Sequence, residues 1–175
     1  QGIEFTWQRG GDIEPQALQE FYDCYQSTYL KRSRQGYLTY EFFAQLLTQM
    51  PDKLLLVTAS QEKKPLAYAL FFVDDHTLYG RYWGCLEEVA FLHFETCYYQ
   101  GIDYCIANNI PHFDAGAQGE HKLARGFIPQ ITHSYHYLAE TGFNDAIKQY
   151  CKAEAEQIEH YMQWAQTALP YKSNN

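Results

Sequence analysis

The sequence predicts an α+β fold in which a mixed, largely antiparallel sheet carries helices on both faces. Residues 54–59 and 66–73 are continuous apolar runs bounded by turn residues, a pattern typical of strands buried on both faces. Residues 77–83 follow the second run through the short turn 74–76, which favours an antiparallel meander of these three strands. Apolar residues at helical spacing before and after the meander supply the layers that would cover the sheet.

The first 50 residues are expected to contain one strand and two helices. Residues 3–7 alternate like a short strand, and an acid followed by Pro in residues 12–15 is typical of a helix start. After a basic loop at 31–36, Thr39 can cap a second, shorter helix. The expected inward positions are Leu18, Phe21, Tyr22, Tyr25 and Tyr29 in the first helix and Phe42, Phe43, Leu46, Leu47 and Met50 in the second.

The second half of the chain is expected to add helices on the opposite face and two more strands. Residues 90–108 have a helical period, and Gly101 would allow a close approach to the sheet. Residues 112–115 and 131–138 have the pattern of strands, and residues 143–167 that of a long amphipathic helix. The expected inner stripe of the first of these helices is Phe91, Phe94, Tyr98, Ile102 and Cys105.

Length and charge limit the classes of function. The 175 residues suit one domain or two very small ones, and 13 Lys and Arg against 21 Asp and Glu give a net charge of −8. That charge opposes long-range attraction to nucleic acid or to an anionic membrane. No stretch reaches the roughly 18 apolar residues of a membrane helix. The five cysteines lie on apolar stripes and are expected to be free thiols, and the alternative, a catalytic Cys, has no local signature. A cytoplasmic location is the expectation.

The densest group of polar side chains lies in a glycine-punctuated segment, residues 116–126, with one expected helical turn. Glycines let backbone N–H groups approach a ligand, and a turn that begins near Gly119 would direct its dipole at an anion or a developing oxyanion. Glu120 and His121 are of the types that most often carry protons in catalysis. Lys122 and Arg125 can hold a carboxylate or a phosphate. The alternative is a solvated turn whose opposite charges pair with each other.

Two further groups of residues are candidates for substrate binding. Arg81 and Trp83 share one face of the strand 77–83, where an Arg beside aromatic rings can stack and still bind an acid. His93 starts the following helix, and it is either a base or a packed helix-start histidine. His133 and Tyr135 share one face of the expected strand 131–138, for which ordinary packing is the alternative. The spacing of histidines and cysteines predicts no metal site.

Residues 79–84, 92–100 and 116–126 together resemble the signature blocks of a bacterial family of predicted N-acyltransferases, the Fem-like proteins labelled peptidoglycan biosynthesis/recognition. That family is similar to the Gcn5-related acyltransferase superfamily, whose fold the expected element order matches. The resemblance implies transfer of an acyl or aminoacyl group to an amine, with acyl-CoA or aminoacyl-tRNA as the donor. In one respect the chain departs from the superfamily, because residues 84–90 read GCLEEVA where its pyrophosphate loop would lie.

The resemblance also implies a domain organisation and a partner. Fem-type proteins carry such domains in tandem, and this chain resembles the C-terminal half, a single acyltransferase-like domain over 1–175 whose partner would be an N-terminal acyltransferase-like domain. The rival function is a non-catalytic half that binds peptide or muropeptide in a Tyr-lined groove. The candidate catalytic residues are Glu120 and His121, and the candidate substrate-binding residues are Arg81, Trp83, His93, Gln118, Gly119, Lys122, Arg125, His133 and Tyr135.

Overall fold

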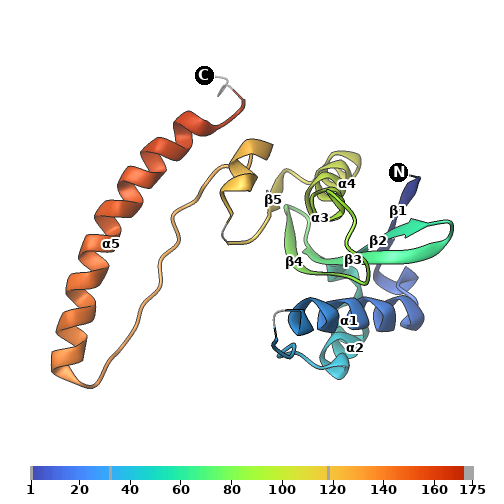
Figure 1. Cartoon of the computed structure of the whole chain (residues 1–175), viewed down its shortest axis with the longest axis horizontal. Coiled ribbons are helices and arrows are strands. Elements are labelled where there is room, and N and C mark those ends of the chain that lie inside the picture. The colour runs from blue at the N-terminus through green and yellow to red at the C-terminus, as the bar shows by residue number, and fades with distance from the viewer. Residues whose placement is uncertain (1, 32, 118, 172–175) are drawn as a thin grey trace. The chain divides into compact units, whose positions relative to one another are not determined.

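The two continuous apolar runs form the centre of a five-stranded sheet in the computed structural model, which describes residues 2–31, 33–117 and 119–171 (Figure 1). The chain divides into two units, residues 1–116 and 117–175, and the sheet belongs to the first. Its strands lie in the order β1-β2-β3-β4-β5, all antiparallel except the last pair, β4 and β5. The predicted α+β class and the mixed sheet are confirmed. The strands are β1 (Ile3–Arg9), β2 (Leu54–Gln61), β3 (Lys64–Val73), β4 (Thr77–Cys85) and β5 (His112–Asp114).

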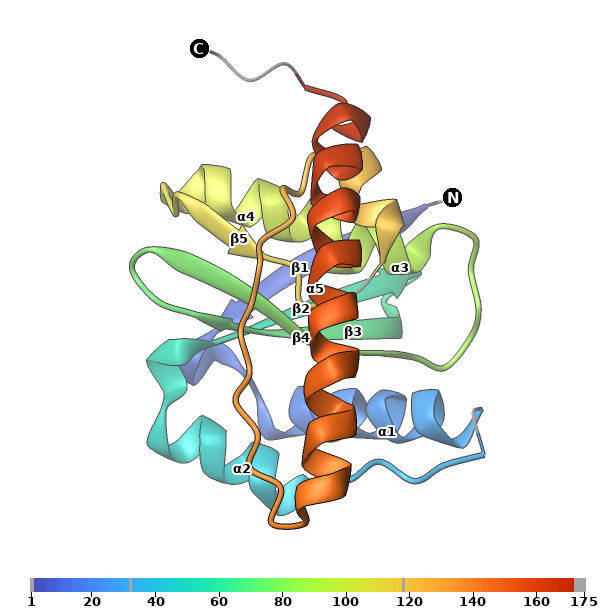
Figure 2. The same ribbon diagram turned by 90° about the vertical axis from the view of Figure 1, so that its left-hand side faces the viewer.

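Helices cover both faces of this sheet, as predicted. Helices α1 (Pro15–Leu30) and α2 (Tyr40–Gln49) lie on one face, and α4 (Gln100–Asn108) lies on the other (Figure 2). Because successive strand residues point to opposite faces, β2 contributes to both cores. Leu56 packs with α1 and α2, whereas Leu55 packs with α4.

The ends of the first two helices follow from their sequence. Pro15 is the first residue of α1, and the hydroxyl of Thr39 accepts a hydrogen bond from the Phe42 N–H at the start of α2. Two inward assignments in α2 are wrong. Phe42 is 36% exposed and Met50 is 45% exposed, because this short helix buries only the stripe centred on Phe43.

The segment after β4 is not one regular helix. Helix α3 (Leu92–Phe94) passes through a π-helical turn, Glu95–Tyr99, into α4. The predicted inner stripe holds for Tyr98 and Cys105 but is wrong for Phe91, which is 76% exposed, because Phe91 precedes the helix in the left-handed conformation, with φ +67°. The predicted close approach at Gly101 is confirmed, because a Cβ atom there would lie 2.6 Å from the Phe113 ring.

The second unit contains a 3₁₀ helix, Glu120–Arg125, and the long helix α5 (Thr141–Ala168), both of which were predicted. The predicted strand at 131–138 is wrong. Its alternating pattern is present, but among the described residues this stretch pairs with no strand, and Tyr135 is 94% exposed. An alternating pattern shows that a segment can form a strand, but the strand forms only where another strand pairs with it. None of the described helices has the length and apolar character of a membrane span.

Candidate active site

The strands β4 and β5 separate after three residue pairs. Thr77 pairs with His112 and Tyr79 with Asp114, and β4 then continues to Cys85 without β5 beside it. A β-bulge marks the same place, because Leu70 pairs with Tyr82 and Phe71 with Gly80, which leaves Arg81 as the extra residue. Bulges of this kind redirect side chains and often lie next to active sites.

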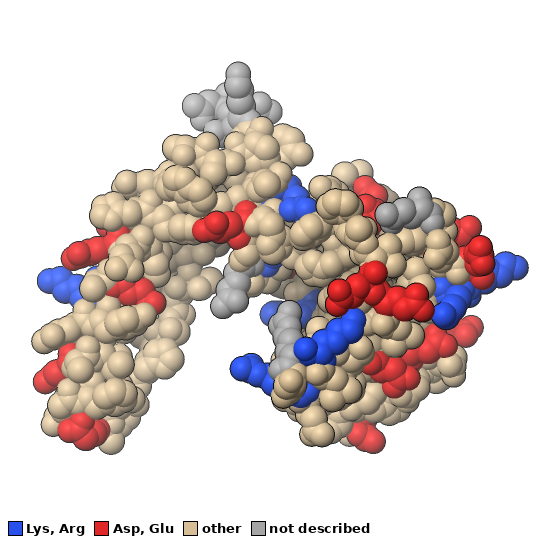
Figure 3. Space-filling model, in the orientation of Figure 1, with Lys and Arg blue, Asp and Glu red and all other residues tan. Residues whose placement is uncertain are grey.

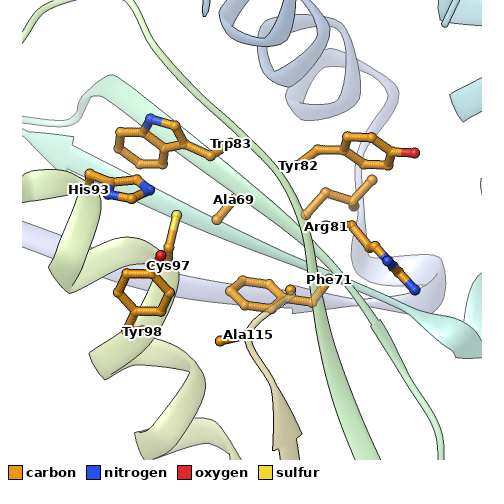
Figure 4. Close-up of a pocket in the computed structure, with 11 residues that line it drawn as sticks. Ala69, Phe71, Arg81, Tyr82, Trp83, His93, Cys97, Tyr98 and Ala115 are labelled. Carbon is orange, nitrogen blue, oxygen red and sulfur yellow. The ribbon is translucent and has the colours of Figure 1, made fainter. Parts of the chain in front are cut away.

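A cavity of about 120 Å³ opens where these strands separate (Figure 4). It lies between the sheet and the helical segment that follows β4. An engineered cavity of about 150 Å³ takes up benzene, so a cavity of this size accommodates a group of only a few heavy atoms. It is lined by Ala69, Leu70 and Phe71 of β3, by Gly80, Arg81, Tyr82 and Trp83 of β4, by His93, Cys97 and Tyr98 of the helical segment, and by Ala115.

Aromatic packing fixes the wall formed by the helical segment. The His93 ring lies edge-on to Trp83, with centroids 5.2 Å apart, and edge-on to Tyr98 at 5.5 Å. The π-helical turn supplies Cys97 and Tyr98, and such turns occur frequently at functional sites. Figure 4 shows the Cys97 sulfur directed toward the His93 ring and Ala69.

The cavity is lined without a negative charge. Among the described residues that line it, none is an Asp or a Glu, and the permanent charge is that of Arg81. Burial and, to a smaller extent, the neighbouring Tyr37 hydroxyl together raise the pKa of Tyr82 to about 12, so Tyr82 keeps its proton at neutral pH. The cavity therefore suits an uncharged group, and an anionic part of a ligand is attracted to the exposed Arg81.

The structure separates the predicted site residues into two sets. Arg81, Trp83 and His93 meet at the cavity in the first unit. Glu120 and His121, with the other candidates of the 3₁₀ helix, belong to the second unit, and Gln118 lies outside the described residues. Those other candidates are Gly119, Lys122 and Arg125. His133 and Tyr135 are exposed on the extended stretch of the second unit.

The 3₁₀ helix holds His121 in a cationic surrounding. Arg125 donates to the His121 carbonyl at 2.6 Å, and Lys122 donates to the Ala117 carbonyl at 3.2 Å. Gly119 has a φ of +107°, and the His121 ring occupies the space where a Cβ of residue 119 would lie. Partial burial, with Arg125 and Lys122 nearby, lowers the pKa of His121 below its usual 6.5. At neutral pH the imidazole is therefore in the form that accepts a proton.

Replacing Arg125 with glutamine is expected to raise the pKa of His121. The substitution removes a positive charge that repels the imidazolium ion, and the amide can still donate to the His121 carbonyl. An NMR titration of the histidine Cε1 protons measures the shift. Lys148→Gln, on the exposed surface of α5, is the matched control and should leave the His121 pKa unchanged. An unchanged His121 titration in Arg125→Gln would contradict the cationic surrounding.

Sequence reasoning missed several residues that line the cavity. Cys97 was assigned to an apolar stripe, yet it follows His93 by four residues, a spacing that places two side chains on one helix face. That spacing was the available signal. Phe71 carried none, because its place at the cavity depends on the bulge between β3 and β4.

Comparisons with known proteins place the fold among acetyltransferases. A family model named FemAB-like, described as peptidoglycan biosynthesis/recognition, matches residues 1–173. An aminoglycoside acetyltransferase, meta-AAC0020, from an uncultured soil metagenomic sample is 12% identical with a TM-score of 0.52, over 78% of this chain and 97% of that chain. A possible acetyltransferase from Clostridium difficile 630 is 12% identical with a TM-score of 0.53, over 81% of this chain and 100% of that chain. A predicted acetyltransferase with acetyl-CoA, from Clostridium acetobutylicum, is 13% identical with a TM-score of 0.52, over 78% of this chain and 95% of that chain. No curated protein matches the sequence.

Proposed function

This chain belongs to the FemAB-like family of peptidoglycan biosynthesis and recognition, and from that membership we propose that it transfers an acyl group to an amine of a cell-wall precursor or a small peptide. The observation that carries the proposal is the cavity where β4 and β5 separate. It lies on a fold shared with acetyltransferases, and it has the volume of a small acyl group.

Each chemical requirement of amide formation has a candidate in the chain. The acyl group occupies the neutral cavity beside Trp83, and Arg81 at the bulge binds an anionic group of the substrate. The second unit by itself offers an alternative set of groups, with Glu120 or neutral His121 as the proposed base that takes a proton from the amine. In that set, Lys122 is proposed to hold an anionic group, and backbone N–H groups near Gly119 are proposed to stabilise an oxyanion.

The loop from β4 to α3, residues 86–91, does not fit the pyrophosphate of coenzyme A. It contains no glycine, and it carries Glu87 and Glu88, which pair with Lys64 at 3.4 Å and with Lys31 at 3.5 Å. A pyrophosphate brought to this loop would face both carboxylates. We therefore describe the donor only by the chemistry that it must have, an acyl ester or an acyl thioester.

The surface charge argues against the other proposed donor, an aminoacyl-tRNA. On the face drawn in Figure 3, basic side chains gather at one edge of the first unit, and acidic side chains border them. A protein that binds tRNA needs phosphate contacts from Lys and Arg, and a net charge of −8 opposes them. As the donor, an uncharged acyl group on a small carrier fits this surface charge better than an aminoacyl group on tRNA does.

A non-catalytic recognition domain is the second candidate function. The observation in its favour is the unsuitable loop at 86–91 together with the edge of β4 beyond Tyr79, along which β5 is absent. An extended peptide can add to such an edge through main-chain hydrogen bonds. On this proposal the chain would bind the substrate, and a proposed N-terminal acyltransferase-like domain would perform the transfer.

Binding and turnover measurements on the full-length protein separate the two candidates. Calorimetric titrations with acetyl-CoA and with a peptidoglycan precursor show which class of ligand binds. Alanine substitutions at Arg81, Glu120 and His121 should each lower turnover by at least about 10²-fold if these residues act as proposed. Glu159→Ala, exposed on α5, is the matched control. Normal turnover in all three variants would assign catalysis to another part of the protein.

A further inference from the structure

We propose that Cys97 accepts the acyl group as a thioester before the group passes to the amine, with His93 as the base that activates the thiol. This inference rests on the proposed acyl transfer. It adds a covalent intermediate and a further catalytic pair, both in the first unit, at the cavity already described.

The position of Cys97 supports this role. The side chain is half-buried, and it is part of the cavity wall together with Ala69 and Trp83. Its sulfur is directed toward the His93 ring, one helical turn earlier in the chain (Figure 4). A nucleophile beside a base, at a cavity sized for the reacting group, is the arrangement that covalent catalysis requires.

His93 is held in place by its neighbours. Its ring makes edge-on contacts with Trp83 and Tyr98, on two different walls of the cavity. The π-helical turn begins two residues after His93, and it includes Cys97. An imidazole fixed in this way next to a thiol is preorganised for proton transfer.

The other four cysteines are placed differently. Cys105 lines a second hollow together with His112, but its thiol donates to the His112 backbone carbonyl, at 3.9 Å. Burial raises the pKa of Cys24 to about 12 and that of Cys105 to about 11, so both remain inert thiols. Cys85 is half-buried beside the Lys31 ammonium group at 3.9 Å, and Cys151 is exposed on α5. Neither of these two residues lines the cavity, so Cys85 serves as an internal comparison for thiol reactivity alone.

The cavity also defines the class of acyl group. A volume of about 120 Å³ limits the group to a few heavy atoms, as in acetyl or propionyl. No carboxylate among the described lining residues is present to pair with an α-ammonium group, which would therefore be desolvated without compensation. The acyl group is accordingly small and uncharged.

The two steps balance as follows. His93 takes the thiol proton while the Cys97 sulfur attacks the carbonyl carbon of the donor ester or thioester. The bond from that carbon to the leaving group breaks, and the leaving group departs with the proton from His93. The acceptor amine then attacks the thioester carbon, the C–N bond forms and the C–S bond breaks. The proton that the amine loses passes to the sulfur and restores the thiol.

The test uses p-nitrophenyl acetate as an acyl donor that needs no recognition of a carrier. After a short incubation with the full-length protein at neutral pH, mass spectrometry of acid-quenched peptides should find one acetyl group on Cys97. Cys85→Ser should leave this acetylation unchanged, and Cys97→Ser should abolish it. His93→Asn should slow it by about 10²-fold, because the base is replaced by a polar amide that cannot accept the thiol proton. Absence of acetyl-Cys97, or equal rates at Cys97 and Cys85, would overturn the proposal.

A second readout separates failure of the intermediate from failure of the proposed function. An amine-containing peptide from a peptidoglycan precursor, added to the acetylated protein, should discharge Cys97 faster than water does and should itself become acetylated. If the protein acetylates the peptide at a normal rate in the Cys97→Ser variant, transfer is direct and the covalent intermediate is wrong. If Cys97 is acetylated but no amine accepts the group, the proposed N-acyl transfer is wrong.

Discussion

Replacing Gly84 with alanine is expected to lower the free energy of unfolding by about 3 kcal/mol or more, the upper range for overpacking a core. A Cβ atom at residue 84 would overlap the Cys24 carbonyl and lie 2.6 Å from the Tyr25 nitrogen, both in the backbone of α1. A backbone inside a helix cannot rotate away as a side chain does. Helix α1 must therefore retreat from β4, and it carries the fully buried Phe21.

The matched control for this substitution is Gly80→Ala in the same strand. A Cβ atom there would have the Asp114 carbonyl oxygen at 3.6 Å and the Ala115 Cα at 3.7 Å as neighbours, which are ordinary contacts. Urea denaturation of the two variants measures the difference, and in thermal unfolding about 3 kcal/mol corresponds to a shift of roughly 6–12 °C. Equal stability of Gly84→Ala and Gly80→Ala would contradict the close contact of α1 with β4.

The parts of the fold that the sequence predicted have local causes. Continuous apolar runs produced β2 and β3, since a strand that contributes to two cores has no polar face. Thr39 marked the start of α2, and Asn109, in the left-handed conformation, marked the end of α4. In each case the residue itself supplies the hydrogen bond, the backbone conformation or the burial that determines the element.

The predictions that failed concern the start of a helix and the pairing of a strand. The helix after β4 begins only at Leu92, behind a left-handed Phe91, so a helical period that started at residue 90 placed Phe91 inward when it is exposed. The stretch 131–138 has the alternation of a strand, but a strand also needs a partner edge. The spacing of apolar residues in the sequence shows neither the residue at which a helix begins nor whether a strand has a partner.

The same distinction applies to the candidate site. Arg81, Trp83 and His93 are close in sequence, and the end of β4 with the start of the next helix brings them together. Cys97 follows His93 by four residues, and this helical spacing was the signal that could have placed it beside them. Glu120 was predicted from the polar cluster of residues 116–126, and it belongs to a different unit from the cavity, so its part in catalysis stays a proposal.

Filling the cavity should test its role more directly than removing any charged group. Ala69 of β3 lies on the cavity wall, and its small side chain leaves part of the space open. Leucine at this position would occupy the place of a small acyl group. Because even a 1 Å misplacement of a reacting group can cost about 10²-fold, exclusion of the group should cost at least about 10³-fold in kcat/KM. Stability should change less, since the added carbons enter existing space.

The series Ala69→Ser, Ala69→Val and Ala69→Leu makes this expectation quantitative. Serine leaves the cavity of about 120 Å³ nearly unchanged, so turnover should stay near that of the unmodified protein, whereas valine should produce an intermediate loss. Steady-state kinetics should also be measured with acyl donors of increasing length, because a partly filled cavity should exclude a propionyl group before it excludes an acetyl group. A loss of activity that follows unfolding temperature instead of side-chain volume would mean that the substitutions act through stability. A loss that follows volume at constant stability assigns the acyl group to this cavity.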